Sequence, residues 1–190
     1  MKQNRNQVPQ PGSLLLSEPF LHDENFSRAV VLLCEHKEES GSIGFVMNKP
    51  SILNLGDLFS ELDFLDAEVF VGGPVEQNTL HFIYFGVQVM EESRALGNGV
   101  WWGGDFPTLV QLINSGKLNL SQVRFFLGYS GWSPGQLADE LKDNSWIVYS
   151  ESFVEELFEN SAEQLWRSLM KRLGGEIEIQ SNYPTDPRLN

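Results

Sequence analysis

Hydrophobic residues along this chain occur mainly in short runs, separated by polar or glycine-containing turns. Runs of this length that are rich in Val, Leu, Ile and Phe predict β-strands. The second and third runs are joined by the polar residues 37–41, which is typical of a β-hairpin. Asn48-Lys49-Pro50 ends this hairpin, because proline has no N–H for the sheet ladder. The predicted strands span residues 13–16, 28–36, 43–47, 69–71, 79–85, 100–102, 123–127 and 146–149.

Helices are predicted where a capping residue precedes an apolar pattern with a spacing of three to four residues. The clearest begins at Ser161, which forms a capping box with Gln164, and it stops at Gly174, which tolerates a left-handed conformation. In another, Asp105 is the N-cap and Pro107 lies in the first turn. The predicted helices span residues 55–59, 105–114, 136–142 and 161–173.

The order of these elements predicts the fold class. Strands and helices do not alternate regularly, which favours an α+β fold over a doubly wound parallel sheet. A length of 190 residues fits a single domain. We place this domain at residues 13–180, between a flexible N-terminal leader at 1–12 and an extended C-terminal tail at 181–190.

The net charge excludes several classes of partner. Lys and Arg total 13 against 26 Asp and Glu, which gives a formal net charge of −13. Because neutralisation of phosphates dominates affinity for nucleic acids, direct binding to DNA, RNA or an anionic membrane surface is not expected. The only tight basic cluster comprises Arg167, Lys171 and Arg172. It is expected to be the solvated face of the last predicted helix, with its cations near the helix C-terminus.

Cysteine and histidine are scarce. The single cysteine, Cys34, excludes an intramolecular disulfide, and the three histidines form no HExxH pattern, so neither a metal nor a cofactor is predicted. Cys34 and His36 lie two apart on one predicted strand and are the candidate reactive pair, although a buried structural thiol is the favoured role for Cys34. The N-terminus lacks an apolar signal core, and no apolar run approaches the ~20 residues of a membrane span, so the cytoplasm is the expected location.

The segment Gly128-Tyr-Ser-Gly-Trp-Ser-Pro-Gly-Gln-Leu137 is the most unusual part of the sequence. It is predicted to be a strand-to-helix turn over 128–135, where the amides of Gly135 and Gln136 could face an anion at the start of the next helix. It lacks the lysine of a P-loop, and Trp132 stands where a nucleophile elbow has its second glycine. The alternative is a structural corner with Trp132 packed beneath it.

Five sequence segments, taken together in their order along the chain, resemble the YqgE/AlgH family of uncharacterised bacterial proteins. The resemblance extends over about residues 12–174. It implies an α+β fold with a small closed, barrel-like, mostly antiparallel sheet, further strands and surrounding helices. The family carries a transcriptional-regulator label, but no DNA-binding motif accompanies it here and no catalytic residues can be transferred. The segments that carry the resemblance are 12–19, 26–36, 44–50, 72–75 and 128–137.

Two functions remain open. The first is a non-enzymatic binding or regulatory protein that recognises a small molecule or a protein through a cleft of Gly- and Pro-rich loops. The alternative is a hydrolase or nucleotide-handling enzyme that uses the Gly128–Gly135 turn as an anion site. The partner and the oligomeric state are left open. The candidate binding residues are Asn48, Pro50, Gly72, Gly73, Pro74, Gly128, Ser130, Gly131, Trp132, Gly135 and Gln136.

Overall fold

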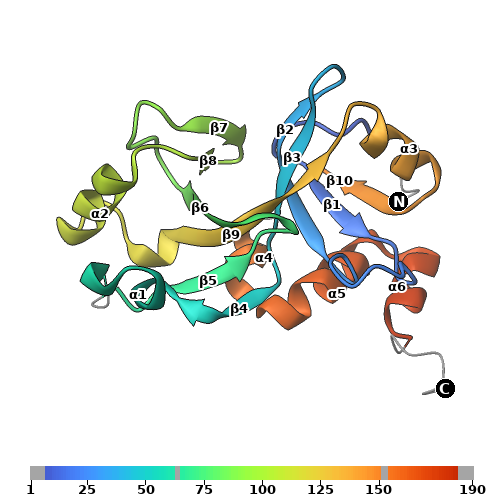
Figure 1. Cartoon of the computed structure of the whole chain (residues 1–190). Coiled ribbons are helices and arrows are strands. Elements are labelled where there is room, and N and C mark those ends of the chain that lie inside the picture. The colour runs from blue at the N-terminus through green and yellow to red at the C-terminus, as the bar shows by residue number, and fades with distance from the viewer. Residues whose placement is uncertain (1–6, 63–64, 151–153, 184–190) are drawn as a thin grey trace.

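One branched sheet organises the molecule (Figure 1). A computed structural model describes residues 7–62, 65–150 and 154–183. Over these residues, ten strands follow the order β10-β1-β2-β3-β9-β6-β8-β7, with β5 beside β9 and β4 beside β5. All described pairs are antiparallel except β5 with β9. The strands are β1 (Leu14–Ser17), β2 (Val30–Lys37), β3 (Gly41–Val46), β4 (Pro50–Asn54), β5 (Glu68–Val71), β6 (Val75–Phe85), β7 (Arg94–Gly97), β8 (Val100–Trp102), β9 (Val123–Trp132) and β10 (Trp146–Tyr149).

The predicted α+β fold with a mostly antiparallel sheet is confirmed. The closed barrel implied by the resemblance is not formed. Among the described strands, β10 pairs only with β1 and β7 pairs only with β8, so both ends of the strand order remain free edges. The sheet is therefore open, and it branches at β9.

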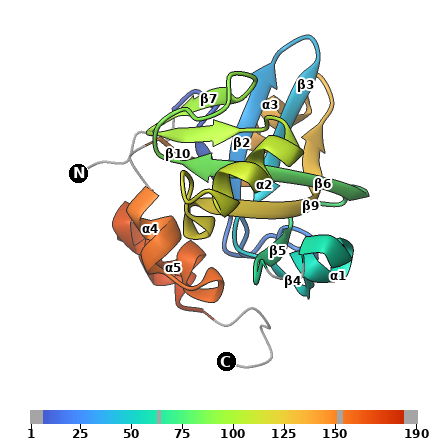
Figure 2. The same ribbon diagram turned by 90° about the vertical axis from the view of Figure 1, so that its left-hand side faces the viewer.

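The first three residues of β1 and the first five of β2 are all hydrophobic because both faces of the sheet are covered there. Successive side chains on a strand point to opposite faces. Leu14 and Leu16 pack in one core with helices α4 (Val154–Glu159), α5 (Ala162–Leu173) and α6 (Gly175–Ser181). Leu15 and Val31 pack in another core with α3 (Gln136–Lys142). In both views α4 and α5 lie side by side on one side of the sheet (Figures 1 and 2).

Strand β9 runs across the middle of the molecule and contributes to cores on both of its faces (Figure 1). Phe126 packs with the C-terminal helices, whereas its neighbour Phe125 packs in a core that includes α1 (Leu55–Leu58) and α2 (Phe106–Asn114). The second half of β9 pairs with β3 and the first half with β5, on the same edge. The sheet therefore divides along this edge of β9.

The helices begin and end close to the predicted residues, but Ser161, the N-cap of α5, makes no side-chain capping hydrogen bond, so the predicted capping box with Gln164 is not formed. The Asp105 carboxylate accepts from the Thr108 N–H at 2.9 Å and starts α2. Gly174 follows α5 with a φ of 68° and a ψ of −170°, so the predicted stop at this glycine is confirmed, although its conformation is not the left-handed helical one. The buried side of α5 consists of Leu165, Trp166, Leu169 and Met170. Among the described helices, none is both long and apolar enough to cross a membrane.

The prediction that residues 128–135 form a turn is wrong for its first half. Strand β9 continues to Trp132, because Gly131 pairs with β3 and Tyr129 pairs with β6. Gly128 has a φ of 66° and accommodates the bend within the strand. The sequence pattern also missed β4, β7, α4 and α6. Pro50 is tolerated in β4 because, among the described strands, β4 is an edge strand paired only with β5.

The predicted leader and tail lie partly outside the described residues. Of their described parts, the Gly12 N–H donates to the Leu33 carbonyl at 2.7 Å, and Ser181 is the last residue of α6.

Candidate functional site

The candidate binding residues fall in three loop segments, at 48–50, 72–75 and 128–136. The first two segments meet at one pocket of about 570 Å³, which we call the loop pocket. Asn48, Lys49 and Pro50 come from the end of the β2–β3 hairpin, and Val71 and Gly73 come from the end of β5. The pocket also has walls from the loop after β1 and from the first turn of α5, at Asn25 and Glu163. Residues far apart in sequence therefore enclose a single hollow.

The side chain of Asn48 holds the hairpin ends together. Its Oδ1 accepts from the Val30 N–H at 2.8 Å, and its Nδ2 donates to the Arg28 carbonyl at 2.9 Å. These bonds use one acceptor site and one donor of the amide, so Asn48 fixes the shape of the wall.

Lys49 closes the wall between the hairpin and the loop after β1. Its Nζ donates to the carbonyls of Glu24 and Asn25 at 2.8 and 2.7 Å. Burial lowers the pKa of Lys49, and the charge of Asp23 partly offsets this effect. The lysine is thus a partly buried cation in a fixed position.

Glycine is required where the end of β5 crosses β9. A Cβ on Gly72 would lie 2.3 Å from the Gly128 carbonyl oxygen, and a Cβ on Gly73 would lie 2.3 Å from the carbonyl carbon of Tyr129. The fully buried Ser130 hydroxyl donates to the Gly72 carbonyl at 3.0 Å. The Gly72 N–H and carbonyl also bond to Leu127 and Val46, so this residue joins β5, β3 and β9 where the sheet divides. Gly128 and Ser130 therefore contact Gly72, which is the neighbour of Gly73 in the wall of the loop pocket.

Residues 132–136, the second part of the third segment, do not line the loop pocket. The Trp132 indole donates to the Glu140 carboxylate at 2.9 Å beside α3. Gly135, with a φ of 80°, precedes α3, and the Gln136 side chain accepts from the Ser133 N–H at 3.0 Å. Pro74 and Gly131 are exposed, and neither borders the loop pocket. The three segments therefore do not close one common cleft: two form the wall, and half of the third supports it.

The structure gives Cys34 and His36 different partners. Cys34 is buried, as predicted, its thiol faces the Leu32 carbonyl at 3.6 Å, and burial raises its pKa. His36 shares a hydrogen bond of 2.8 Å with the Ser42 hydroxyl. Neither residue borders the loop pocket. Within the described part of the chain, no group of three His, Cys, Asp or Glu side chains could hold a metal ion.

A second hollow of about 690 Å³ adjoins the loop pocket and shares Asn48, Lys49 and Glu163 with it. We call it the basic groove, because Arg28, Lys49, Arg167 and Lys171 line it. Arg167 and Lys171 are exposed, as predicted for a solvated face, but the sequence analysis did not anticipate that Arg28 and Lys49 line the same groove. Arg28 precedes β2 and Lys49 follows β3, so the antiparallel pairing of the hairpin was a usable signal that these two cations lie close together.

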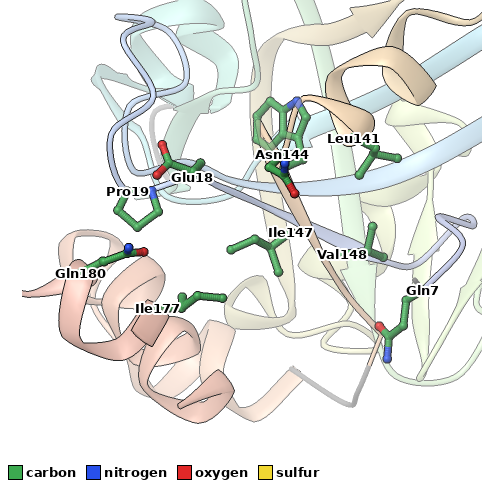
Figure 3. Close-up of a pocket in the computed structure, with 10 residues that line it drawn as sticks. Gln7, Glu18, Pro19, Leu141, Asn144, Ile147, Val148, Ile177 and Gln180 are labelled. Atoms are coloured by element: carbon green, nitrogen blue, oxygen red, sulfur yellow. The ribbon is translucent and has the colours of Figure 1, made fainter. Parts of the chain in front are cut away.

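A third hollow, of about 350 Å³, lies beside the edge strand β10 (Figure 3). Ile147 and Val148 from β10, Ile177 from α6 and Leu141 from α3 give it an apolar lining. It contains none of the predicted binding residues, and Glu18 is the only charged residue among those lining it.

Comparisons with known proteins agree with the motifs. A family model described as AlgH-like matches residues 14–178. A UPF0301 protein of Cytophaga hutchinsonii is 42% identical over 180 residues, covering 94% of this chain and 98% of that protein. A UPF0301 protein of Chlorobaculum tepidum is 40% identical over 187 residues, covering 98% and 99%.

Solved structures show the same fold. The solution structure of the AlgH protein from Pseudomonas aeruginosa matches with a TM-score of 0.70 and 27% identity, covering 97% of this chain and 98% of that one. The crystal structure of DIP2367 from Corynebacterium diphtheriae matches with a TM-score of 0.78 and 23% identity, covering 96% and 95%. The chain therefore belongs to the AlgH-like family, as its loop motifs indicated.

Proposed function

We propose that this protein is a non-enzymatic binding protein that holds a small molecule in the loop pocket. The observation that carries the proposal is the convergence of Asn48–Pro50 and Val71–Gly73 on one hollow of about 570 Å³. Sites for small molecules are typically hollows of this size, with apolar walls and a few polar groups. Val46, Pro50 and Val71 supply the apolar wall, and Lys49 supplies a fixed polar group.

The groups around the loop pocket favour binding over catalysis. The titratable side chains that line it are Glu24, Lys49 and Glu163. The Lys49 ammonium is bonded to two backbone carbonyls, and the hydroxyl of Ser130 is buried and bonded to the Gly72 carbonyl. A nucleophile with an adjacent base is the usual signature of covalent catalysis, and the residues lining this pocket do not include such a pair.

The enzyme alternative has less support. It uses residues 128–135 as an anion-binding turn, but residues 128–132 of this segment belong to strand β9. Cys34 and His36, which would supply its chemistry, bond to Leu32 and Ser42. The binding function is therefore the one that we carry forward.

A pocket-filling variant tests the proposal. Asn25 is an exposed residue at the pocket wall, so Asn25→Trp should fill part of the hollow with little cost in stability. Asn78→Trp, on the exposed part of β6, is the matched control. In an NMR screen of small metabolites, compounds that bind should shift the amide signals of Lys49, Val71 and Gly73. They should lose binding to Asn25→Trp and keep it with Asn78→Trp.

Three results would overturn the proposal. The first is a screen in which no compound binds, and the second is one in which all binders shift amides remote from the loop pocket. The third is equal affinity of the binders for Asn25→Trp and for the wild type.

A further inference from the structure

We infer that the basic groove is the site for the phosphoryl group of a small phosphorylated molecule. The inference rests on the proposed function, since the groove and the loop pocket share Asn48, Lys49 and Glu163. In this arrangement the phosphoryl group lies in the groove and the rest of the molecule extends past Lys49 into the loop pocket.

The charge of the groove is opposite to that of the chain. Four cationic side chains line it, namely Arg28, Lys49, Arg167 and Lys171, together with one carboxylate, Glu163. The chain as a whole has a formal net charge of −13. Arg28 and Lys49 come from the ends of the hairpin, and Arg167 and Lys171 come from α5. Two remote parts of the chain thus bring their positive charges to one place.

None of these four cations forms a salt bridge among the described residues, although the charge of Asp23 acts on Lys49. The salt bridges found there join Glu35 to Lys37 and Arg94, Asp139 to Lys142, and Glu156 to Arg172. The Arg28 Nε is buried and has no hydrogen-bond partner among the described residues. A buried N–H without an acceptor is costly, so a bound anion would supply what the protein itself does not.

Arg28 and Arg167 are close enough for their charges to oppose each other. Burial is the main cause of the lowered pKa of Arg28, and the positive charge of Arg167 lowers this pKa further. Like charges held together without a counterion destabilise the folded protein, and an anion between them reverses this effect.

Arg28 is held in position before any ligand binds. Its guanidinium lies over the Trp166 ring, 5.3 Å from the ring centroid, and its Nη2 donates to the Tyr183 carbonyl. Its backbone has a φ of 50°, which is uncommon for a residue other than glycine. A cation that is already fixed loses less conformational entropy when it binds a ligand.

The donors in the groove fit a phosphoryl group. A phosphoryl group presents three acceptor oxygens and up to two negative charges. The forked guanidinium of an arginine matches such an anion with two parallel hydrogen bonds, and lysine adds a point charge. Ser27, Gln164 and Ser168 border the same groove and offer neutral donors. The volume of about 690 Å³ exceeds what a single phosphate fills, which favours a phosphorylated small molecule.

Inorganic pyrophosphate is the probe, titrated calorimetrically into the full chain at low ionic strength. The test variant is Arg167→Gln/Lys171→Gln, and both side chains are exposed. The control is Lys117→Gln/Lys142→Gln, which removes the same charge from exposed positions outside the groove. We expect the wild type and the control to bind with affinities within about twofold of each other, and the test variant to bind at least about tenfold more weakly.

The inference is overturned if the wild type does not bind pyrophosphate, or if both double variants lose affinity equally. Citrate distinguishes phosphoryl from carboxylate chemistry, and tighter binding of citrate than of pyrophosphate would also overturn the inference. Asn25→Trp separates the two proposals because it fills the loop pocket and leaves the four cations in place. It should retain pyrophosphate binding even though it loses the metabolites that depend on the loop pocket.

Discussion

His81 is a half-buried histidine in an aromatic environment. Its ring centroid lies 5.2 Å from that of Phe45, and the ring meets Tyr129 edge-on at 5.9 Å. Its Nε2 shares a hydrogen bond of 3.0 Å with the Thr79 hydroxyl. Burial lowers the pKa of His81, and the charge of Glu76 offsets part of this effect. The folded protein therefore favours the neutral ring.

This pKa shift makes the stability of the protein depend on pH. Below the usual histidine pKa of about 6.5, the unfolded chain binds more protons at this position than the folded chain does. The contribution of His81 to the free energy of unfolding is therefore present above that pH and is lost as the pH falls toward the lowered pKa. Urea denaturation of the wild type and of His81→Gln at about pH 7.5 and about pH 5.5 checks this.

We expect His81→Gln to lose less stability between these two pH values than the wild type does. His22→Gln, at an exposed histidine, is the control and should follow the wild type. An equal pH dependence in the wild type and His81→Gln would contradict the assignment.

The candidate residues show what single positions in a sequence can and cannot reveal. Asn48, Gly72 and Gly73 stood out in the sequence, and each occupies a place in the structure that few residue types can fill. The restriction on residue type at these positions comes from contacts with backbone that is distant in sequence. A local sequence pattern does not contain those contacts. Arg28 and Lys49 looked ordinary in the sequence, yet the pairing of the hairpin brings both to one groove.

At the scale of elements, one carboxylate joins α3 to two strands. The indole N–H groups of Trp132 on β9 and Trp146 on β10 both donate to the same oxygen of Glu140, at 2.9 and 2.7 Å. Both tryptophans are 5% exposed, so water cannot readily replace this acceptor. The Gln136 side chain donates to the other oxygen at 2.9 Å. The position of α3 thus depends on a shared acceptor as well as on apolar contact.

Glu140→Leu should lower the free energy of unfolding by about 2–4 kcal/mol, because it leaves two mostly buried N–H groups without an acceptor. Glu140→Gln retains an acceptor oxygen and should lose clearly less. Asp139→Asn, at an exposed position on the same helix, should change stability by no more than about 0.5 kcal/mol. Denaturant titration followed by tryptophan fluorescence measures all three. A loss in Glu140→Leu no larger than in Asp139→Asn would contradict this role.

The elements also show where prediction from a single sequence fails. The strands β1 and β2 and the helices α2 and α5 were predicted, because their apolar patterns reflect burial that each segment encodes locally. Strand β9 was cut short at Gly128, because glycine usually marks a turn. Pairing of its second half with β3 and β6 outweighs that preference.

On the scale of the whole molecule, the protection of backbone amides against hydrogen exchange should depend on where a strand lies in the sheet. β9 pairs with β3, β5 and β6, and Phe125 and Phe126 lie in separate cores on its two faces. Strand β7 lies at the end of the strand order, and three of its four residues are exposed. Opening of β9 therefore requires loss of both cores, whereas β7 can open alone.

Native-state hydrogen exchange should show the amides of Phe125 and Phe126 among the slowest to exchange, with an opening free energy close to that of global unfolding. The amides of residues 94–97 should exchange at least about a hundredfold faster. Equal protection of β7 and β9 would show that the molecule opens as a single cooperative unit, contrary to this expectation.

The basic groove draws its two walls from opposite ends of the polypeptide, with Arg28 and Lys49 on one side and Arg167 and Lys171 on the other. An occupant that contacts both walls would act as a reversible crosslink across more than a hundred intervening residues. Because such an occupant binds the folded chain and not the unfolded one, it would raise the free energy of unfolding by an amount set by its concentration relative to its Kd. Occupancy would thus fasten the C-terminal helices to the N-terminal hairpin, in a protein whose single cysteine rules out a covalent tie within the chain.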